Sequence, residues 1–276
     1  MIADVYLPQW LDECLFANLK ANYCCSNSDM TVIDWNKNDV LNYLGTYFPR
    51  SYAEAYCICC NFFTLYSQNW KSKKEISVFD FGCGTGGEVF GLLKAINRCL
   101  PNVKQVKIIA LDGNQYALRL FEKVANAYST HVNIEIKYRV VPVEIDDFYD
   151  LSILDSIISE KFDIIMSFKA ICEFVTKERF EQQNAYKYIA QSFLPKLKSD
   201  GIILFVDVTT YNNVSQEWLP MMMDKGLASV NCRIVQSNKG YNQIFTVSHS
   251  KRLRDVSKIA WRIIQKLNNH EKRLDD

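Results

Sequence analysis

Glycines and an acidic residue are concentrated where an apolar run of the chain meets a turn. Asp80 is followed by Gly82, Gly84, Gly86 and Gly87. Glycine lets the backbone pass close beneath a ligand, because no Cβ stands in the way. The helix expected just beyond the turn supplies free N–H groups and the positive end of a dipole. This pattern predicts a site for a nucleotide-like cofactor with polar or anionic groups.

A second apolar run, residues 106–111, ends in Asp112, Gly113 and Asn114. A carboxylate at the tip of the second strand of an open sheet can accept hydrogen bonds from both ribose hydroxyls of an adenosine. We therefore expect Asp112 to bind a ribose, with Gly113 and Asn114 beside it.

The glycine spacing by itself fits two cofactors. Gly82, Gly84 and Gly87 match the G-x-G-x-x-G of dinucleotide enzymes, whereas the first two together with Gly86 match G-x-G-x-G. Asp80 stands two residues before the first glycine, where a nicotinamide-binding strand normally carries an apolar residue. The acid favours the second pattern.

In this order of strand, glycine turn, helix, strand and terminal acid, residues 75–250 resemble the class I S-adenosylmethionine-dependent methyltransferases. Asp80 and residues 82–86 match the family's first motif, and Asp112 matches its second. The resemblance implies S-adenosylmethionine as cofactor and methyl transfer as reaction. Two alternatives stay open: a cofactor-binding assembly or regulatory protein that keeps the fold without the chemistry, and an NAD-dependent oxidoreductase.

The resemblance also implies which residues surround the cofactor. The glycine turn contacts the methionine portion, an acid after the third strand accepts from the adenine amino group, and the loop after the fourth strand lies beside the methyl group. The cofactor-binding residues expected are Asp80, Gly82, Cys83, Gly84, Gly86, Asp112, Gly113, Asn114, Glu144, Ser167 and Phe168.

Few residues are candidates for a catalytic base. The methyl donor is already activated, so the enzyme mainly aligns the reactants, and a base is needed only when the acceptor must lose a proton early. None of the three histidines stands at an expected strand tip. Lys169, Glu173 and Tyr52 of the N-terminal region are the expected catalytic residues. The alternative for Lys169 and Glu173 is an exposed helical pair four residues apart.

Strands and helices alternate from residue 75 onward, which predicts an α/β fold with a doubly wound, mostly parallel sheet. The resemblance implies a seven-stranded Rossmann-like sheet, closed by strands at 230–237 and 242–249. Residues 1–74 read as an α-helical N-terminal cap for substrate recognition. Residues 251–276 carry eight Lys and Arg against four Asp and Glu, with apolar residues at helical spacing, which predicts a basic C-terminal helix.

The composition of the chain limits the kinds of partner that it is expected to bind. The 276 residues carry a net charge of +1, and no apolar run approaches the ~18 residues that span a bilayer, so no membrane partner is expected. A basic C-terminal helix can bind RNA phosphates, so RNA is the first acceptor considered and a small molecule the second. The oligomeric state is not predicted.

Ten cysteines without a regular framework indicate reduced thiols and a cytoplasmic location. Cys57 and Cys60 have the spacing of metal ligands, with Cys59 between them. They lie in an aromatic helical stretch without a second C-x-x-C. Buried packing is the interpretation we prefer, and no metal site is predicted.

Overall fold

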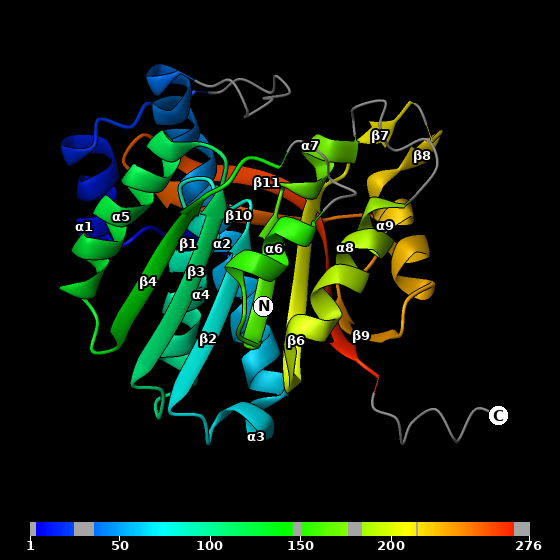
Figure 1. Cartoon of the computed structure of the whole chain (residues 1–276). Coiled ribbons are helices and arrows are strands. Elements are labelled where there is room, and N and C mark those ends of the chain that lie inside the picture. The colour runs from blue at the N-terminus through cyan, green and yellow to red at the C-terminus, as the bar shows by residue number, and fades with distance from the viewer. Residues whose placement is uncertain (1–3, 25–35, 146–150, 176–183, 214, 268–276) are drawn as a thin grey trace. The chain divides into compact units, whose positions relative to one another are not determined.

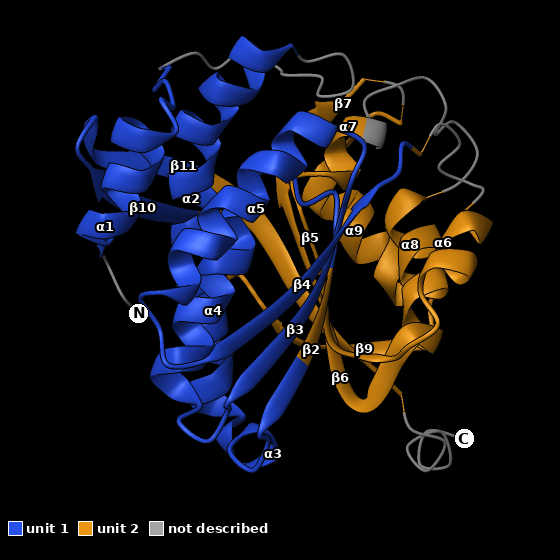
Figure 2. Cartoon of the chain, turned by 60° about the vertical axis from the view of Figure 1, so that its left-hand side comes forward, with its two compact units in different colours: residues 1–76, 80–144, 244–257 blue, residues 77–79, 145–243, 258–276 orange. Residues whose placement is uncertain are grey.

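The chain forms two compact units, each assembled from discontinuous stretches (Figure 2). The structure is a computed structural model that describes residues 4–24, 36–145, 151–175, 184–213 and 215–267. Unit 1 comprises residues 1–76, 80–144 and 244–257, and unit 2 comprises residues 77–79, 145–243 and 258–276.

Unit 1 contains the N-terminal helices and the glycine turn. Its helices are α1 (Gln9–Asp12), the π-helix η1 (Glu13–Asn18), α2 (Lys37–Leu65), α3 (Ser67–Trp70), α4 (Gly87–Cys99) and α5 (Gln115–Ser129). Its strands are β1 (Val5–Tyr6), β3 (Gln105–Asp112), β4 (Glu135–Pro142) and β10 (Gln243–His249), and it shares β2 (Glu75–Phe81) and β11 (Arg252–Lys266) with unit 2.

The long helix α2 is fixed at its start and along its length. Asn36 caps it by accepting from the backbone N–H groups of Asn38 and Asp39, and the Asp39 side chain accepts in return from the Asn36 N–H. This reciprocal capping box satisfies donors that a helix start otherwise leaves unpaired. Farther along, the helix lies directly against α4, since a Cβ on Gly91 would come within 2.2 Å of the Tyr52 carbonyl oxygen.

In unit 1, β3 and β4 are parallel and in register from Gln105 opposite Glu135 to Asp112 opposite Pro142. Helix α5 follows β3 and buries one face, including Phe121. The carboxyl end of β3 therefore places Asp112 at the sheet edge where an α/β fold binds its ligands.

Unit 2 is built on β5 (Phe162–Phe168) and β6 (Leu197–Val208), which run parallel. Its other elements are α6 (Ser152–Ile157), α7 (Ile171–Val175), α8 (Ala185–Phe193), η3 (Leu194–Lys196), β7 (Tyr211–Asn212), β8 (Glu217–Trp218), α9 (Leu219–Ala228) and β9 (Cys232–Ser237). Ile259–Ile264 of β11 pair antiparallel with β6, and β9 pairs antiparallel with the last residues of β11.

The fold is the expected α/β class: a large, mostly parallel central sheet flanked by helices, with a helical N-terminal extension (Figure 1). The sheet has nine strands in the described residues rather than the seven expected. One added strand is β1 of the N-terminal extension, which runs parallel to β10. The two expected closing strands correspond to β9 and β10.

The expected basic C-terminal helix is wrong for residues 252–266, which form strand β11. The apolar residues of this segment fit helical spacing, but from Ile259 to Ile264 they form a nearly continuous buried run that pairs with the buried strand β6. A strand buried on both faces loses the simple alternation that identifies strands, so its sequence is ambiguous. Residues 268–276 lie outside the described part of the chain.

Candidate functional site

The glycine turn joins β2 to α4 through left-handed backbone. The φ angles are 71° at Gly82, 49° at Gly84 and 81° at Gly86. A side chain is strained at such angles. At Gly84 it would also meet a neighbour, because an added Cβ would lie 3.1 Å from Cε1 of Tyr43. The sequence thus gives a turn whose backbone a ligand can approach closely.

Strand β3 holds the turn in place. The carbonyl oxygen of Leu111 accepts from the backbone N–H groups of Gly82 at 2.9 Å and Cys83 at 3.0 Å, and Gly86 N–H donates to the Cys83 carbonyl at 2.7 Å. The Cys83 side chain is buried, and burial raises the pKa of its thiol well above the usual value. Cys83 therefore presents a neutral, small side chain within the turn.

Asp112 links the two sequence motifs. Its Oδ2 accepts from Gly84 N–H at 2.7 Å and its Oδ1 from Asn114 N–H at 2.8 Å. Burial raises the pKa of the Asp112 carboxyl, while these two hydrogen bonds lower it. Since each carboxylate oxygen has two lone pairs, Asp112 can accept from a pair of ligand hydroxyls as well.

Asp80 is completely buried beside two other carboxyls, those of Glu88 and Asp112. Its pKa is raised well above the usual value, first by burial, then by the charge of Glu88 and a side-chain hydrogen bond with it, and last by the charge of Asp112. Thr85, in the turn itself, is also fully buried, and its Oγ1 has no partner among the described groups. Buried polar atoms of this kind are costly unless something pairs with them, so the turn is suited to a ligand that carries donors.

Three other expected cofactor residues lie beside Asp112. Asn114 caps α5, because its side-chain oxygen accepts from the backbone N–H groups of Tyr116 and Ala117 at 3.0 Å each. A Cβ on Gly113 would come within 3.3 Å of the Cα of Glu144, so Glu144 is adjacent to Gly113. The Glu144 side chain is exposed. The structure thus brings together Asp80, Gly82, Cys83, Gly84, Gly86, Asp112, Gly113, Asn114 and Glu144 in unit 1.

Sequence reasoning missed two residues of this cluster. Tyr43 of α2 lies against Gly84, and its ring stacks on that of Tyr47 with centroids 5.1 Å apart. Glu88, buried in the first turn of α4, adds its charge to that of Asp80. Glu88 could have been found from the sequence, because it lies in the helix that directly follows the glycine motif. Tyr43 is 41 residues before Gly84, so no local pattern points to it.

The remaining expected cofactor residues are in unit 2. Ser167 and Phe168 are buried at the carboxyl end of β5, and the Ser167 hydroxyl has no hydrogen-bond partner in the described residues. Lys169 follows with a left-handed φ of 57°, and its backbone N–H donates to the Val206 carbonyl at 2.7 Å. Glu173 lies in α7 and, like Lys169, is half-buried.

Asp207, at the carboxyl end of β6, is another buried acid of unit 2. It accepts from the hydroxyl of Tyr186 at 2.8 Å and from the backbone N–H of Cys172 at 3.3 Å. Burial raises the pKa of Asp207 to about 6, although both hydrogen bonds oppose the shift. This carboxyl is held by the protein itself.

Tyr52 does not lie at an accessible position. Its side chain is buried, and burial raises the pKa of its hydroxyl strongly. A proton transfer from this group is therefore disfavoured, and its contacts fit packing of α2 against α4. The cysteines of the same helix are also buried, with the thiol pKa raised to about 12 at both Cys57 and Cys60 by burial.

A family profile described as a methyltransferase domain matches residues 72–268, which is most of the chain and includes the glycine turn, Asp112 and β5–β6. The chain belongs to the methyltransferase-domain family. No curated protein matches it in sequence.

Solved structures of methyltransferases are similar to this chain at low identity. A putative RNA methyltransferase from Pyrococcus horikoshii is 10% identical, with 95% of this chain and 99% of that chain covered and a TM-score of 0.46. A putative class I S-adenosylmethionine-dependent methyltransferase from Listeria monocytogenes is 13% identical, with 92% and 66% covered and a TM-score of 0.47. TrmN from Thermus thermophilus is 14% identical, with 74% of this chain covered and a TM-score of 0.42, and this chain spans about half of its length, 48%.

Membership of the methyltransferase-domain family agrees with S-adenosylmethionine as the cofactor, which the motifs around Asp80 and Asp112 lead us to expect. The cofactor carries ribose hydroxyls, an ammonium group and a positively charged sulfonium. The buried carboxyls of the turn and its unpaired Thr85 hydroxyl match such a ligand in charge and in hydrogen-bonding type. Among the described helices, none is long and apolar enough to cross a membrane.

Proposed function

We propose that this protein is an active S-adenosylmethionine-dependent methyltransferase whose acceptor is RNA. The observation that carries the proposal is the buried carboxyl of Asp80, which lies under an intact glycine turn beside the carboxyls of Glu88 and Asp112. A protein that had lost its cofactor has no need to keep a buried group of this cost.

In this proposal, different residues of unit 1 bind different parts of the cofactor. Asp112 accepts from the ribose hydroxyls, and the turn from Gly82 to Gly86 passes beneath the methionine portion with Cys83 and Gly84. Asp80 balances the positive charge of that portion. Gly113, Asn114 and Glu144 surround the nucleoside, with the exposed Glu144 side chain available to accept from the adenine amino group.

The residues at the end of β5 act on the acceptor. S-adenosylmethionine supplies a methyl group that is already activated for displacement. Lys169 positions the acceptor, and Glu173 takes its proton where one must leave, while Ser167 and Phe168 contact the cofactor. Tyr52 is left out of this set because it is buried.

Charge on unit 1 supports RNA as the acceptor. Lys251, Arg252 and Arg254 are exposed at and just after the turn between β10 and β11, and Lys20 of the N-terminal segment is exposed as well. The one acid within this run, Asp255, is already paired with Arg50 through two 2.8 Å contacts. Basic groups left without neutralising partners attract phosphate. From the cysteine content we also propose a cytoplasmic location.

Calorimetric titration with S-adenosylmethionine, S-adenosylhomocysteine and NADH tests the cofactor, and Asp112→Ala is the matched variant. Micromolar binding of the first two that the variant loses supports the proposal, and binding of NADH alone contradicts it. The wild-type protein is then incubated with methyl-labelled S-adenosylmethionine and separate RNA, protein and metabolite pools. Label in RNA supports the acceptor, label only in another pool replaces it, and binding without any label indicates a non-catalytic protein.

A further inference from the structure

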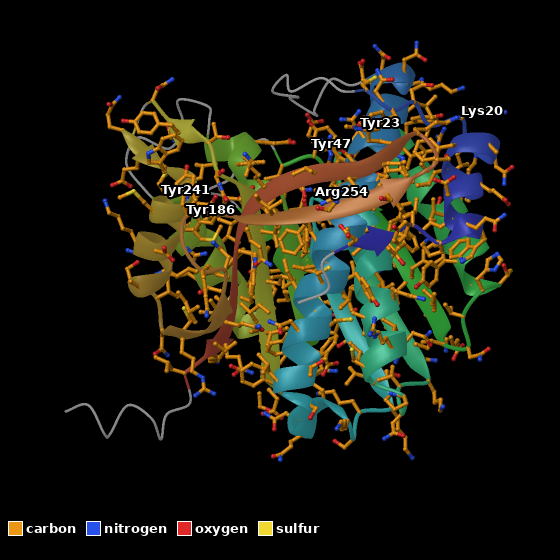
Figure 3. All side chains as sticks on the ribbon, turned by 180° about the vertical axis from the view of Figure 1, so that it is seen from behind. Lys20, Tyr23, Tyr47, Tyr186, Tyr241 and Arg254 are labelled. Atoms are coloured by element: carbon orange, nitrogen blue, oxygen red, sulfur yellow. The ribbon has the colours of Figure 1, made fainter. Side chains whose placement is uncertain are left out.

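A cavity of about 470 Å³ lies in unit 1 away from the glycine turn. Its lining residues are Phe16, Lys20, Ala21, Asn22, Tyr23 and Lys251. None of them belongs to the glycine turn or to the residues around Asp112, so the cofactor roles above leave this cavity unexplained. Lys20 and Tyr23, both of the N-terminal segment, are labelled in Figure 3.

The cavity combines two cations with an aromatic wall. Lys20 and Lys251 are exposed, and Nζ of Lys251 lies 5.9 Å from the ring centre of Phe16. Tyr23 is half-buried. Cations beside flat rings are the arrangement that binds a phosphate and its neighbouring base.

Buried groups fix the aromatic wall from behind. The ring of His249 stacks on Phe16 with centroids 5.2 Å apart and meets Tyr23 edge-on at the same distance. The His249 side chain is fully buried, and its Nε2 lies 3.8 Å from Oδ2 of Asp255. The hydroxyl of Tyr23 donates to Oδ1 of Asp255 at 3.1 Å. A wall held in this way loses little conformational freedom when a ligand binds.

Electrostatics at the cavity favour an anion. The carboxylate of Asp255 lies behind the aromatic wall. Two guanidinium nitrogens of Arg50 donate hydrogen bonds to its two oxygens. Asp12 accepts from the backbone N–H of Ser250 at 2.9 Å and so holds the turn that carries Lys251. The charge of Asp255 is thus balanced within the protein, while Lys20 and Lys251 face the cavity.

Backbone strain also gathers at this place. Lys20, one of the lining residues, has a φ of 61°. Left-handed backbone is uncommon outside glycine, and such residues cluster where ligands bind.

We propose that this cavity is a subsite for one nucleotide of single-stranded RNA: Lys20 and Lys251 bind its phosphate groups, and its base stacks on Tyr23. The assignment rests on the proposed RNA acceptor and deepens it, because it says where the strand is held outside the methyl-transfer site. Its test measures binding and not methylation, so the two proposals can fail separately.

The experiment titrates the full chain with a fluorescein-labelled single-stranded RNA 12-mer, followed by fluorescence anisotropy at several salt concentrations. The variant Lys20→Gln with Lys251→Gln removes both charges at nearly constant length. The matched control, Lys258→Gln with Lys266→Gln, removes two exposed charges of β11 that do not line the cavity. We expect about tenfold weaker binding in the first variant at ~0.1 M salt, and a salt slope smaller by about 1.4, since each phosphate contact on a single strand contributes about 0.7. Equal losses in both variants, or no RNA binding by the wild type, overturn the subsite.

Tyr23 tests the base contact. Tyr23→Leu removes the ring, and we expect about tenfold weaker RNA binding because base stacking on an aromatic ring is lost. Tyr23→Phe removes only the hydroxyl that donates to Asp255, and we expect it to bind nearly as the wild type does. Thermal unfolding of both variants checks that they fold, and unchanged affinity in a folded Tyr23→Leu contradicts the stacking role.

Competition identifies the source of the phosphate. Unlabelled RNA 12-mer displaces the probe from an RNA subsite at far lower concentration than AMP or inorganic phosphate does. If AMP displaces the probe at the same concentration as the 12-mer, the proposal that the cavity binds an RNA strand is wrong, and its ligand is a free nucleotide. If inorganic phosphate competes most effectively, the proposed stacking of a base on Tyr23 is wrong.

Discussion

Asp80 in unit 1 and Asp207 in unit 2 are both buried carboxyls on strands, yet their surroundings differ. Asp207 receives hydrogen bonds from Tyr186 and from the backbone of Cys172, whereas the neighbours of Asp80 are two other carboxyls, Glu88, with which it shares a hydrogen bond, and Asp112. Burial raises the pKa of both carboxyls, which for Asp207 reaches about 6. A buried carboxyl that stabilises the fold receives its hydrogen-bond donors from the protein. For a buried carboxyl that binds a ligand, the ligand supplies the donors.

The largest effect expected is at Asp112, which belongs with Asp80 in this comparison. Asp112→Ala removes the acceptor of two charge-assisted bonds to ribose and should weaken S-adenosylmethionine binding about 1,000-fold, or ~4 kcal/mol. Calorimetry measures the loss, and circular dichroism checks that the fold remains. A folded variant that binds within tenfold of the wild type removes Asp112 from the site.

The pH dependence of stability should reveal the raised pKa of Asp207. The native carboxyl holds its proton up to about pH 6, while the unfolded one loses it near pH 4. The native state therefore binds more protons between these values, and the free energy of unfolding should fall by about 3 kcal/mol as the pH rises from 4 to 6 or above. Urea unfolding of wild type and Asp207→Asn measures this, because the variant lacks the contribution. Parallel curves for the two proteins contradict it.

Asp255 extends the comparison to a carboxyl that has a cation. Burial raises the pKa of Asp255, but hydrogen bonds from His249, Arg50 and Tyr23 and the charge of Arg50 lower it to about 2. Its stabilisation is present above the unfolded pKa near 4 and should be lost as the pH falls toward 2, by about 2 kcal/mol. Acid unfolding of wild type and Asp255→Asn between pH 2 and 5 measures the difference. A wild-type curve no steeper than that of the variant is evidence against the ion pair.

The smallest change expected is Asp80→Asn, which sharpens the contrast with Asp207. The amide resembles the protonated carboxyl, so the unfolding free energy of the cofactor-free protein should stay the same within ~0.5 kcal/mol. The affinity for S-adenosylmethionine should fall about tenfold, because the negative charge opposite a cation is lost. Urea unfolding and calorimetry measure the two quantities. Loss of stability with unchanged affinity shows that Asp80 serves the fold, as Asp207 does.

The glycine turn and Asp112 could be predicted from the sequence because their signal is local. A strand, a turn that needs left-handed backbone and an acid at the next strand's tip are visible within 35 residues. The features that the sequence did not reveal have long-range causes. Strand β11 resembles a helix in its spacing, and only its pairing with β6 identifies it. Tyr52 was expected to be catalytic, but its burial depends on the close approach of α4 at Gly91. Tyr43 was missed for the same reason, since its contact with Gly84 depends on how α2 packs.

Three residues of helix α2 belong to a continuous series of contacts that also includes residues outside the helix. Tyr43 lies against Gly84, Tyr47 stacks on Tyr43, and the Arg50 guanidinium lies 5.6 Å from the ring centre of Tyr47. Arg50 in turn binds Asp255, which accepts a hydrogen bond from Tyr23 in the wall of the cavity lined by Lys20 and Lys251. The two ends of this series are the proposed cofactor turn and the proposed nucleotide subsite. Thermodynamic reciprocity then applies: by whatever factor S-adenosylmethionine changes the affinity for RNA through these contacts, RNA must change the affinity for S-adenosylmethionine by the same factor.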